Sequence, residues 1–295
     1  MTLQTPMPCS ALAVQLDEPM IGSVDQRIRW LLVEDRSAWG EKAVRDVLGA
    51  AFEADAKERK IRPLLVRRRE GDPGADAVRR VTLVDTATRE MAVRPVTDPS
   101  DLSELSLDAV ANAPVAEFGA AVSGPIFLVC TNGKRDACCA LRGRALIAEL
   151  AVAHGARAWE STHLGGHRFA GNLVCLPDGI IYGRVTAGHG PRLASAYLEG
   201  RLDPSLLRGR SAWPAPAQVA EQALRLRLGL DGLSDVSLAS IEADADRATV
   251  TLESSGGSVH RFELVAERAS PPRPISCRAD ELEQPLHWRV IQGGA

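Results

Sequence analysis

The order of strand-like and helix-like segments in roughly the first 200 residues constrains the fold most strongly. Short apolar segments typical of strands alternate with segments whose apolar residues recur at helical spacing. In the first copy of this order the strands are at residues 27–34, 62–67, 78–84 and 91–96, and the helices are at 39–57 and 101–111. The copy therefore consists of strand–helix–strand followed by strand–strand–helix.

A second copy of the same order follows. It begins with the apolar strand GPIFLVC at residues 124–130, and Asp136 is a good N-cap for a helix that runs to about His154. The rest of this copy is a strand at 156–161, a hairpin of strands at 172–176 and 180–185, and a helix at 191–198. Two consecutive βαβ–ββα units predict an α/β protein built from tandem thioredoxin-like domains.

The predicted boundaries divide the chain into three parts. An N-terminal thioredoxin-like domain covers residues 1–115, a second one covers 120–205, and residues 214–295 form a small α+β module. The module is expected to hold a helix at 218–228 and antiparallel strands at 236–242, 248–253 and 259–265. The proline-containing segment beyond these strands is expected to be mostly irregular, and no chemistry is assigned to the module.

Composition excludes some classes of function. The 295 residues carry a net charge of −3, so no global electrostatic field points to nucleic acid or to a membrane surface. The sequence lacks a recognisable targeting segment and any apolar run of about 18 residues, so we expect a cytoplasmic protein. In a reducing compartment, six cysteines favour metal binding or redox chemistry over structural disulfides. Cys9, Cys175 and Cys277 are isolated in the sequence and receive no such role.

Two segments hold the residues that can carry chemistry. The first, CTNGKRDACCALRGR, places Cys130 at the end of a strand and Cys139 in the first turn of a helix. The second, WESTHLGGHRFAGN, places His163 and His167 four positions apart with two glycines between them. Paired glycines cost roughly 1 kcal/mol each inside a helix, so they favour a loop here. Glycine also lets backbone N–H groups approach a bound group closely.

Three kinds of site can use these side chains. Two thiolates and two imidazoles complete a tetrahedral zinc site, although eight residues separate the two cysteines and structural zinc sites usually have two to four. The same four donors can hold a [2Fe–2S] cluster, with two cysteines on one iron and two histidines on the other. The third hypothesis is thiol chemistry through the adjacent Cys138 and Cys139. A thiol oxidoreductase of this fold needs C-x-x-C, and the chain has C-C.

The paired segments resemble the sucrase/ferredoxin-like family, a group of thioredoxin-like ferredoxins. Its pattern is a cysteine, a polar loop, a second cysteine nine positions on, and then H-x-G-G-H-x-x-A-x-N. The match includes CSALA from Cys9 and spans roughly the first 200 residues. By position, the resemblance implies that Cys130, Cys139, His163 and His167 bind a [2Fe–2S] cluster. The chain departs from the pattern in the extra thiol of Cys138, which leaves room for a ligand swap.

The resemblance implies a protein that transfers electrons or senses redox state, more an electron carrier than an enzyme. A [2Fe–2S] core with only two thiolates is neutral when oxidised, so its potential should lie above that of plant-type ferredoxins. Histidine ligands keep a second ring nitrogen, so reduction should be coupled to protonation. The alternative is a structural or interaction module with a Cys2His2 zinc site. No carboxylate pair supports a sucrase activity.

Basic residues around the motif suggest a docking patch for an acidic redox partner, such as a reductase. These residues are Lys134, Arg135, Arg142, Arg144, Arg168 and Arg184. Further residues are expected to support the ligands from behind: Cys138, Arg135, Asp136, Gly165, Gly166, Arg168 and Asn172. Neither a nucleic acid nor a membrane is expected as a partner, and the oligomeric state is left open.

Overall fold

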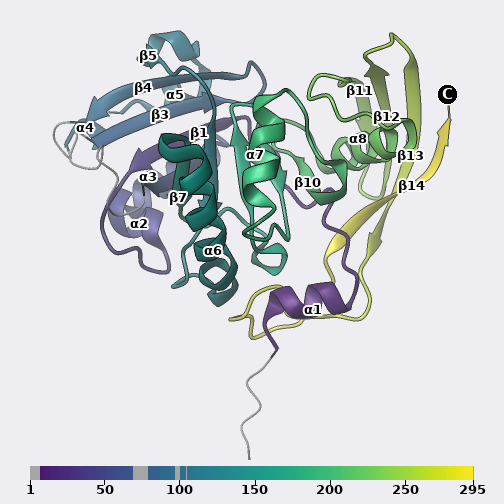
Figure 1. The fold of residues 1–295 in the computed structure, drawn as a ribbon, viewed down its shortest axis with the longest axis horizontal. Coiled ribbons are helices and arrows are strands. Elements are labelled where there is room, and N and C mark those ends of the chain that lie inside the picture. Colours follow the sequence, from purple (N-terminus) through teal and green to yellow (C-terminus); the bar gives the residue numbers. More distant parts are fainter. Residues whose placement is uncertain (1–6, 69–78, 97–99, 104, 295) are drawn as a thin grey trace, which may run out of the picture.

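Two β-sheets organise the chain, in a mixed α/β arrangement (Figure 1). The computed structural model describes residues 7–68, 79–96, 100–103 and 105–294. A large curled sheet has ten strands in the order β10-β9-β8-β6-β7-β2-β1-β3-β4-β5, and a smaller sheet has four in the order β11-β12-β13-β14. Residue 78 of the predicted strand 78–84 and residue 104 of the predicted helix 101–111 lie outside the described residues.

The elements follow the chain in this way. Before and within the first half of the large sheet are α1 (Cys9–Gln15), β1 (Arg29–Glu34), α2 (Ala43–Leu48), α3 (Ala50–Glu58), β2 (Arg62–Arg67), β3 (Arg79–Asp85), β4 (Glu90–Val96), α4 (Ser100–Ser103), α5 (Leu107–Asn112), the 3-10 helix η1 (Val115–Glu117) and β5 (Ala120–Ala121). The second half holds β6 (Ile126–Cys130), α6 (Ala137–His154), η2 (Gly155–Arg157), β7 (Ala158–Ser161), η3 (His167–Phe169), β8 (Leu173–Leu176), β9 (Ile180–Tyr182), α7 (Gly190–Leu198), η4 (Pro204–Leu206) and β10 (Leu207–Arg210). The remainder is α8 (Ala215–Leu228), β11 (Val236–Ala243), β12 (Arg247–Ser254), β13 (Val259–Arg268) and β14 (Leu286–Gly294).

The two halves of the large sheet repeat one strand order. In the first half β1 pairs in parallel with β2 and antiparallel with β3, which pairs antiparallel with β4. In the second half β6 has the same relations to β7 and β8, and β8 pairs antiparallel with β9. The halves join where β2 meets β7 in antiparallel pairing. Just past β7, the N–H of Thr162 donates to the carbonyl of Leu65, which extends the junction.

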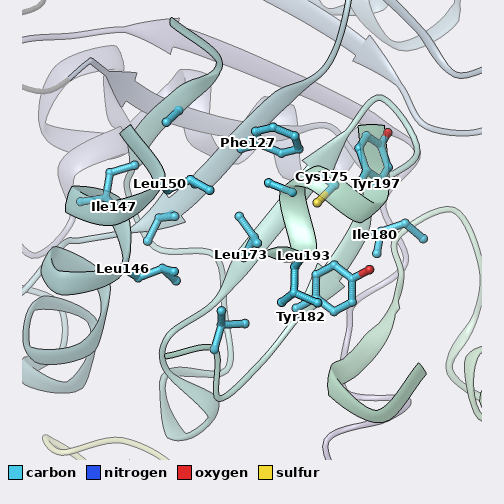
Figure 2. Packing of buried hydrophobic residues seen from close by; sticks show 14 of the residues in the cluster. Phe127, Leu146, Ile147, Leu150, Leu173, Cys175, Ile180, Tyr182, Leu193 and Tyr197 are labelled. Atoms are coloured by element: carbon cyan, nitrogen blue, oxygen red, sulfur yellow. The ribbon is translucent and has the colours of Figure 1, made fainter. Parts of the chain in front are cut away.

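Helices cover one face of the large sheet. Because successive side chains of a strand point to opposite faces, the buried residues form one apolar layer on each face of the sheet. Phe127 of β6 faces α6 and α7, where Leu150 and Tyr197 join the same apolar cluster (Figure 2). Leu128, the next residue of β6, belongs to a cluster on the opposite face that draws on strands of both halves. Cys130 and Cys139 also belong to this second cluster. The candidate ligands therefore lie at the border of a core that both halves build.

The smaller sheet packs against α8. Apolar residues of α8, such as Leu224, meet those of β12 and β13 in one buried cluster. The connection between β13 and β14, residues 269–285, leaves this sheet and runs to α1 (Figure 1). That path brings a late part of the chain beside the N-terminal helix and the start of α6.

Several expectations about the elements are wrong in detail. The helix expected over 39–57 is two helices, because Gly49 has φ +92° and interrupts the helical backbone between α2 and α3. The helix expected over 101–111 is replaced by α4 and α5, and Ser106 caps α5 by accepting from the N–H of Ala109. The proline-containing segment is irregular over residues 269–285 as expected, but the strand that follows it, β14, was not predicted. Among the described helices, none is long and apolar enough to cross a membrane.

Candidate metal centre

The two candidate cysteines are placed by a strand and the helix that follows it. Cys130 is the last residue of β6, and Cys139 lies in the first turn of α6. Asp136 caps this helix as expected, because its side chain accepts from the N–H of Cys138 at 2.9 Å. The helix approaches the strand closely at Gly143, where a methyl group would overlap the carbonyl oxygen of Cys130. This close packing brings the two thiols to the same place.

The histidine segment forms a tight loop after β7. Gly165 and Gly166 both have positive φ, +82° and +65°, which favours glycine and excludes a continuous helix through the two histidines. The loop returns in η3, which begins at His167. It folds the rings of His163 and His167 against one another, with centroids 4.4 Å apart and planes at 21°. The loop predicted from the paired glycines is confirmed.

Donor atoms from the two segments converge. One Sγ atom each from Cys130 and Cys139 and one ring nitrogen of His163 lie within 4.8 Å of one another. The ring of His167 stacks on that of His163, but its nitrogens do not belong to this group of three. In the described part of the chain, the Nδ1 atoms of both histidines are buried and find no hydrogen-bond partner. A bound cationic group would satisfy such nitrogens, so the donor set fits a metal ion or a small cluster.

The protonation states of Cys130 and His167 suit metal binding, whereas Cys139 would have to release its proton to become a ligand. The Cys139 thiol donates to the Cys130 sulfur, which lowers the pKa of Cys130 well below its usual value and raises that of Cys139. A hydrogen bond from His163 also lowers the pKa of Cys130. Burial, together with the neighbouring His163, lowers the pKa of His167 to about 4. His167 is therefore neutral at pH 7, as a ligand must be.

Two arginines hold the backbone of the histidine loop, the buried Arg208 and the half-buried Arg62, and the sequence analysis predicted neither. Arg208 of β10 donates through Nη1 to the carbonyl of Gly165 at 3.1 Å and to Oδ1 of Asn172 at 2.8 Å. Asn172 in turn donates to the carbonyl of Gly166 at 3.1 Å, so it fixes the loop and does not face the thiols. Arg62 of β2 donates to the carbonyl of His163 at 3.4 Å.

Burial lowers the pKa of both arginines, that of Arg208 to about 9. Arg62 acts electrostatically on Cys130 and Arg208 on Cys139. No local pattern identifies either residue, because Arg62 begins the strand RPLLVR and Arg208 lies in the short segment LRGR, which has no apolar run.

The remaining candidates lie around the site in different ways. Cys138 turns away from Cys130 and toward Cys9, whose Sγ is 3.6 Å from its own. Arg168 forms an ion pair with the buried Glu18 at 2.8 Å, and Arg184 donates to carbonyls near α1. Arg135 pairs with Glu41 at 3.5 Å. The side chains of Lys134, Arg142 and Arg144 are exposed.

Two cavities border these residues. One of about 550 Å³ is lined by His163 together with Arg62 and Glu41. The other, of about 1200 Å³, lies at the start of α6 and is lined by Trp39, Cys138 and other residues. His163 therefore has a route to solvent, whereas His167 is buried.

Comparison with protein families supplies one match. A family model described as sucrase/ferredoxin-like covers residues 20–209, which is more than half of the chain and includes both candidate segments. Comparisons with curated proteins and with solved structures gave no significant match. On the extent of the family match, and with the two segments brought together as described above, this chain belongs to the sucrase/ferredoxin-like family.

Proposed function

We propose that the chain binds a [2Fe–2S] cluster through Cys130, Cys139, His163 and His167 and serves as an electron carrier or redox sensor. The observation that carries this proposal is the convergence of two thiols and one imidazole within 4.8 Å, beside a second, stacked imidazole. The buried Nδ1 atoms of both histidines, which lack partners among the described residues, support it. Such a cluster would supply a site that takes up and releases one electron.

The proposal includes a tandem thioredoxin-like scaffold. The repeated strand order of the two halves supports this view, since β2-β1-β3-β4 and β7-β6-β8-β9 have the same directions. We assign residues 1–115 and 120–205 to the two domains and 214–295 to an accessory module. The first domain would then complete the site of the second, because Arg62 of β2 holds the His163 backbone.

Arg62 and Arg208 would favour the reduced state. A guanidinium group that is shielded from water interacts strongly with nearby charge, because the local dielectric constant is low. Arg208 is buried and Arg62 is half-buried, and each holds the backbone of the loop that carries the histidines. Both would stabilise the additional negative charge that arrives with an electron.

His163 would carry the coupled proton. The residue is half-buried and lines the cavity of about 550 Å³ that Glu41 also lines, so a proton would have a short path between its ring and solvent. His167 is 9% exposed and is enclosed by the loop. Proton uptake on reduction should therefore depend on His163 more than on His167.

Docking of an acidic partner would use the exposed cations at the start of α6. Lys134 and Arg144 line the cavity of about 1200 Å³, and the apolar side chain of Leu141 beside them is 63% exposed. An apolar surface with a rim of positive charge suits a transient contact with an acidic protein. Arg168 and Arg184 face other parts of this chain, so they would contribute little.

Iron and acid-labile sulfide in anaerobically purified protein test the proposal directly. We expect two irons and two sulfides per chain and an EPR signal after reduction. Protein that binds zinc at this site and no iron would establish the alternative, a zinc-binding structural module. The zinc measurement must be made on a His163 variant as well, because loss of zinc in that variant identifies the site.

The pH dependence of the reduction potential tests the histidine ligands. For one proton per electron the potential falls by about 59 mV per pH unit. His163→Cys should lower the potential and remove much of this slope, because a thiolate adds negative charge and holds no exchangeable ring proton. His189→Ala, at an exposed histidine outside the site, is the matched control. An unchanged slope in His163→Cys would contradict the assignment of His163.

A further inference from the structure

Three thiols from distant parts of the chain meet beside the candidate cluster site. They belong to Cys9 at the start of α1, Cys138 in the first turn of α6 and Cys277 in the 269–285 connection. The Sγ atom of Cys138 is 3.6 Å from that of Cys9 and 3.3 Å from that of Cys277, and the Cys9 and Cys277 sulfurs are 3.5 Å apart. No pair in this triangle is at the 2.03–2.05 Å of a disulfide bond.

A buried carboxylate completes the group. Asp136 is fully buried, and its two oxygens lie 4.0 and 3.9 Å from the Cys9 sulfur. One oxygen accepts from the N–H of Cys138 at 2.9 Å, and the other accepts from the N–H of Cys277 at 2.9 Å and from the hydroxyl of Ser276 at 3.2 Å. Carboxylates that bind metals are usually oriented by hydrogen bonds of this kind. All four donor groups lie within 4.8 Å of one another.

We propose that Cys9, Cys138, Cys277 and Asp136 form a second metal site, which binds one zinc ion. In a tetrahedral site with Zn–S bonds of about 2.3 Å, the sulfurs lie about 3.8 Å apart. The observed separations of 3.3–3.6 Å are close to this value. Soft thiolate ligands select zinc over magnesium or calcium, and three thiolates with one carboxylate give a complete four-coordinate set.

Charge supports a cation at this point. Among the described residues no lysine or arginine forms an ion pair with Asp136. Its buried carboxylate is held by N–H and O–H donors alone, and three thiols adjoin it. A divalent ion bound to three thiolates and this carboxylate would neutralise two of their four negative charges, and the thiols would release their protons to solvent on binding. The side chain of Cys277 is exposed, which gives the ion a way in.

The second site is distinct from the first, although one ligand of each site is adjacent in the sequence. Cys138 and Cys139 are consecutive on α6, but Cys139 faces Cys130 and Cys138 faces Cys9. The extra thiol that departs from the family pattern therefore has its own partners. Its role would be structural, because a zinc ion here ties the N-terminal helix and the 269–285 connection to the start of α6.

Element analysis of the full-length protein tests the site. Protein expressed with added zinc and purified without chelators should contain one zinc per chain, measured by mass spectrometry separately from iron. Cys277→Ser should lose the zinc and keep its iron, because this exposed residue belongs to the second site alone. Cys175→Ala, which removes a buried thiol outside both sites, is the control and should keep both metals. Zinc absent from the wild type, or retained in Cys277→Ser, Cys9→Ser and Cys138→Ser alike, would overturn the proposal.

X-ray absorption at the zinc edge gives a readout that iron does not disturb. We expect three sulfurs at about 2.3 Å and one oxygen at about 2.0 Å. Zinc with two sulfurs and two imidazole nitrogens, lost in His163→Cys, would place the ion in the first site and overturn the proposal. Failure of the cluster assignment has a different result: no iron or sulfide, with zinc still lost in Cys277→Ser.

Discussion

Gly166 shows how one missing methyl group shapes the candidate centre. Its φ of +65° is a left-handed conformation, and a Cβ atom there would lie 2.6 Å from Cζ of Arg208. The guanidinium group of Arg208 occupies that space and holds the carbonyl of Gly165 and the side chain of Asn172. The conformation of the histidine loop and the position of this buried cation therefore depend on one another.

Gly166→Ala should destabilise the protein and, on the proposed function, lower its iron content. The left-handed backbone costs roughly 1–2 kcal/mol and overpacking against Arg208 roughly 1–3 kcal/mol more. Gly257→Ala is the matched control, because Gly257 also has positive φ (+76°) but has nothing within 4 Å of the added atom. Denaturant unfolding and iron content measure both variants. Equal losses of stability in Gly166→Ala and Gly257→Ala would show that the contact with Arg208 does not contribute to the effect.

At this scale the sequence was informative about residues that are close in the chain. The two segments were identified as the chemical part of the chain from their cysteines, histidines and paired glycines, and the family resemblance implied that all four side chains form one group; three of the four do converge. Cys9 and Cys277 are isolated in the sequence, and Arg62 and Arg208 also lie far along the chain from the segments that hold Cys130 and His163. No local pattern specifies contacts that depend on how remote segments pack.

Helix α6 and strand β6 form the element pair on which the cysteines depend. Gly143 lies within α6, where glycine costs roughly 1 kcal/mol relative to alanine. It is buried against the end of β6, and an added methyl group would overlap the carbonyl oxygen of Cys130. Glycine at this position therefore lowers the intrinsic stability of α6 but allows the helix to pack closely against β6.

Gly143→Ala should lower the free energy of unfolding by about 1–3 kcal/mol, although alanine is the better helix former. Displacement of the helix should also move Cys139 away from Cys130 and reduce iron content. Gly256→Ala, where nothing lies within 4 Å, should change stability by no more than about 0.5 kcal/mol. Thermal unfolding with metal analysis measures both effects. A more stable Gly143→Ala protein would contradict the close approach.

Local signals determined which elements were predicted well. Asp136 as N-cap and the apolar run of β6 were sufficient to predict α6 and its strand nearly to the residue. The apolar spacing over 39–57 did not reveal the break at Gly49, because both short helices present apolar residues to one core. β14 went unpredicted, since its partner β13 is separated from it by the long 269–285 connection.

Across the whole molecule, Glu18 links parts of the chain that are far apart in sequence. It lies buried just after α1 and pairs with Arg168 of the histidine segment at 2.8 Å and with Arg273 of the 269–285 connection at 3.0 Å. Burial opposes its ionisation, but the hydrogen bonds and charges of these two arginines prevail and lower its pKa below 4.5. The ionised carboxylate therefore helps to hold the connection against the site.

Glu18→Gln should destabilise the protein at pH 7 by roughly 3–5 kcal/mol, since it leaves the buried Arg273 and the largely buried Arg168 without their counter-charge. Because the pKa of Glu18 is lowered on folding, its contribution is present above about pH 4.5 and is lost as the pH falls through the lower folded value. The variant should therefore lose less stability than the wild type on acidification. Urea unfolding between pH 7 and pH 3.5 measures this difference.

Glu41→Gln provides the control for this experiment. Glu41 also pairs with two arginines, Arg135 and Arg278, but its side chain is 47% exposed. Exposed ion pairs contribute roughly 0–1 kcal/mol. A loss in Glu18→Gln no larger than in Glu41→Gln would show that the buried network does not stabilise the chain.

The sequence indicated two consecutive units but not that their strands form one sheet. The junction depends on the pairing of β2 with β7, whose residues are about 95 positions apart, and on Thr162 beside Leu65. Neither the sequence of β2 nor that of β7 contains a pattern that identifies the strand with which it pairs. Long-range pairing of this kind is decided when the apolar faces of both units are buried together.

The route of residues 269–285 has a consequence for the order in which the protein is made. Arg273 and Cys277 leave the ribosome only after every residue of the histidine segment and its arginine supports. Until then Glu18 lacks one of its cations, and the thiols of Cys9 and Cys138 lack the third. During synthesis the N-terminal helix and the start of α6 thus form before the segment that links them, and on the proposed function a cluster would reach its ligands before that segment is in place.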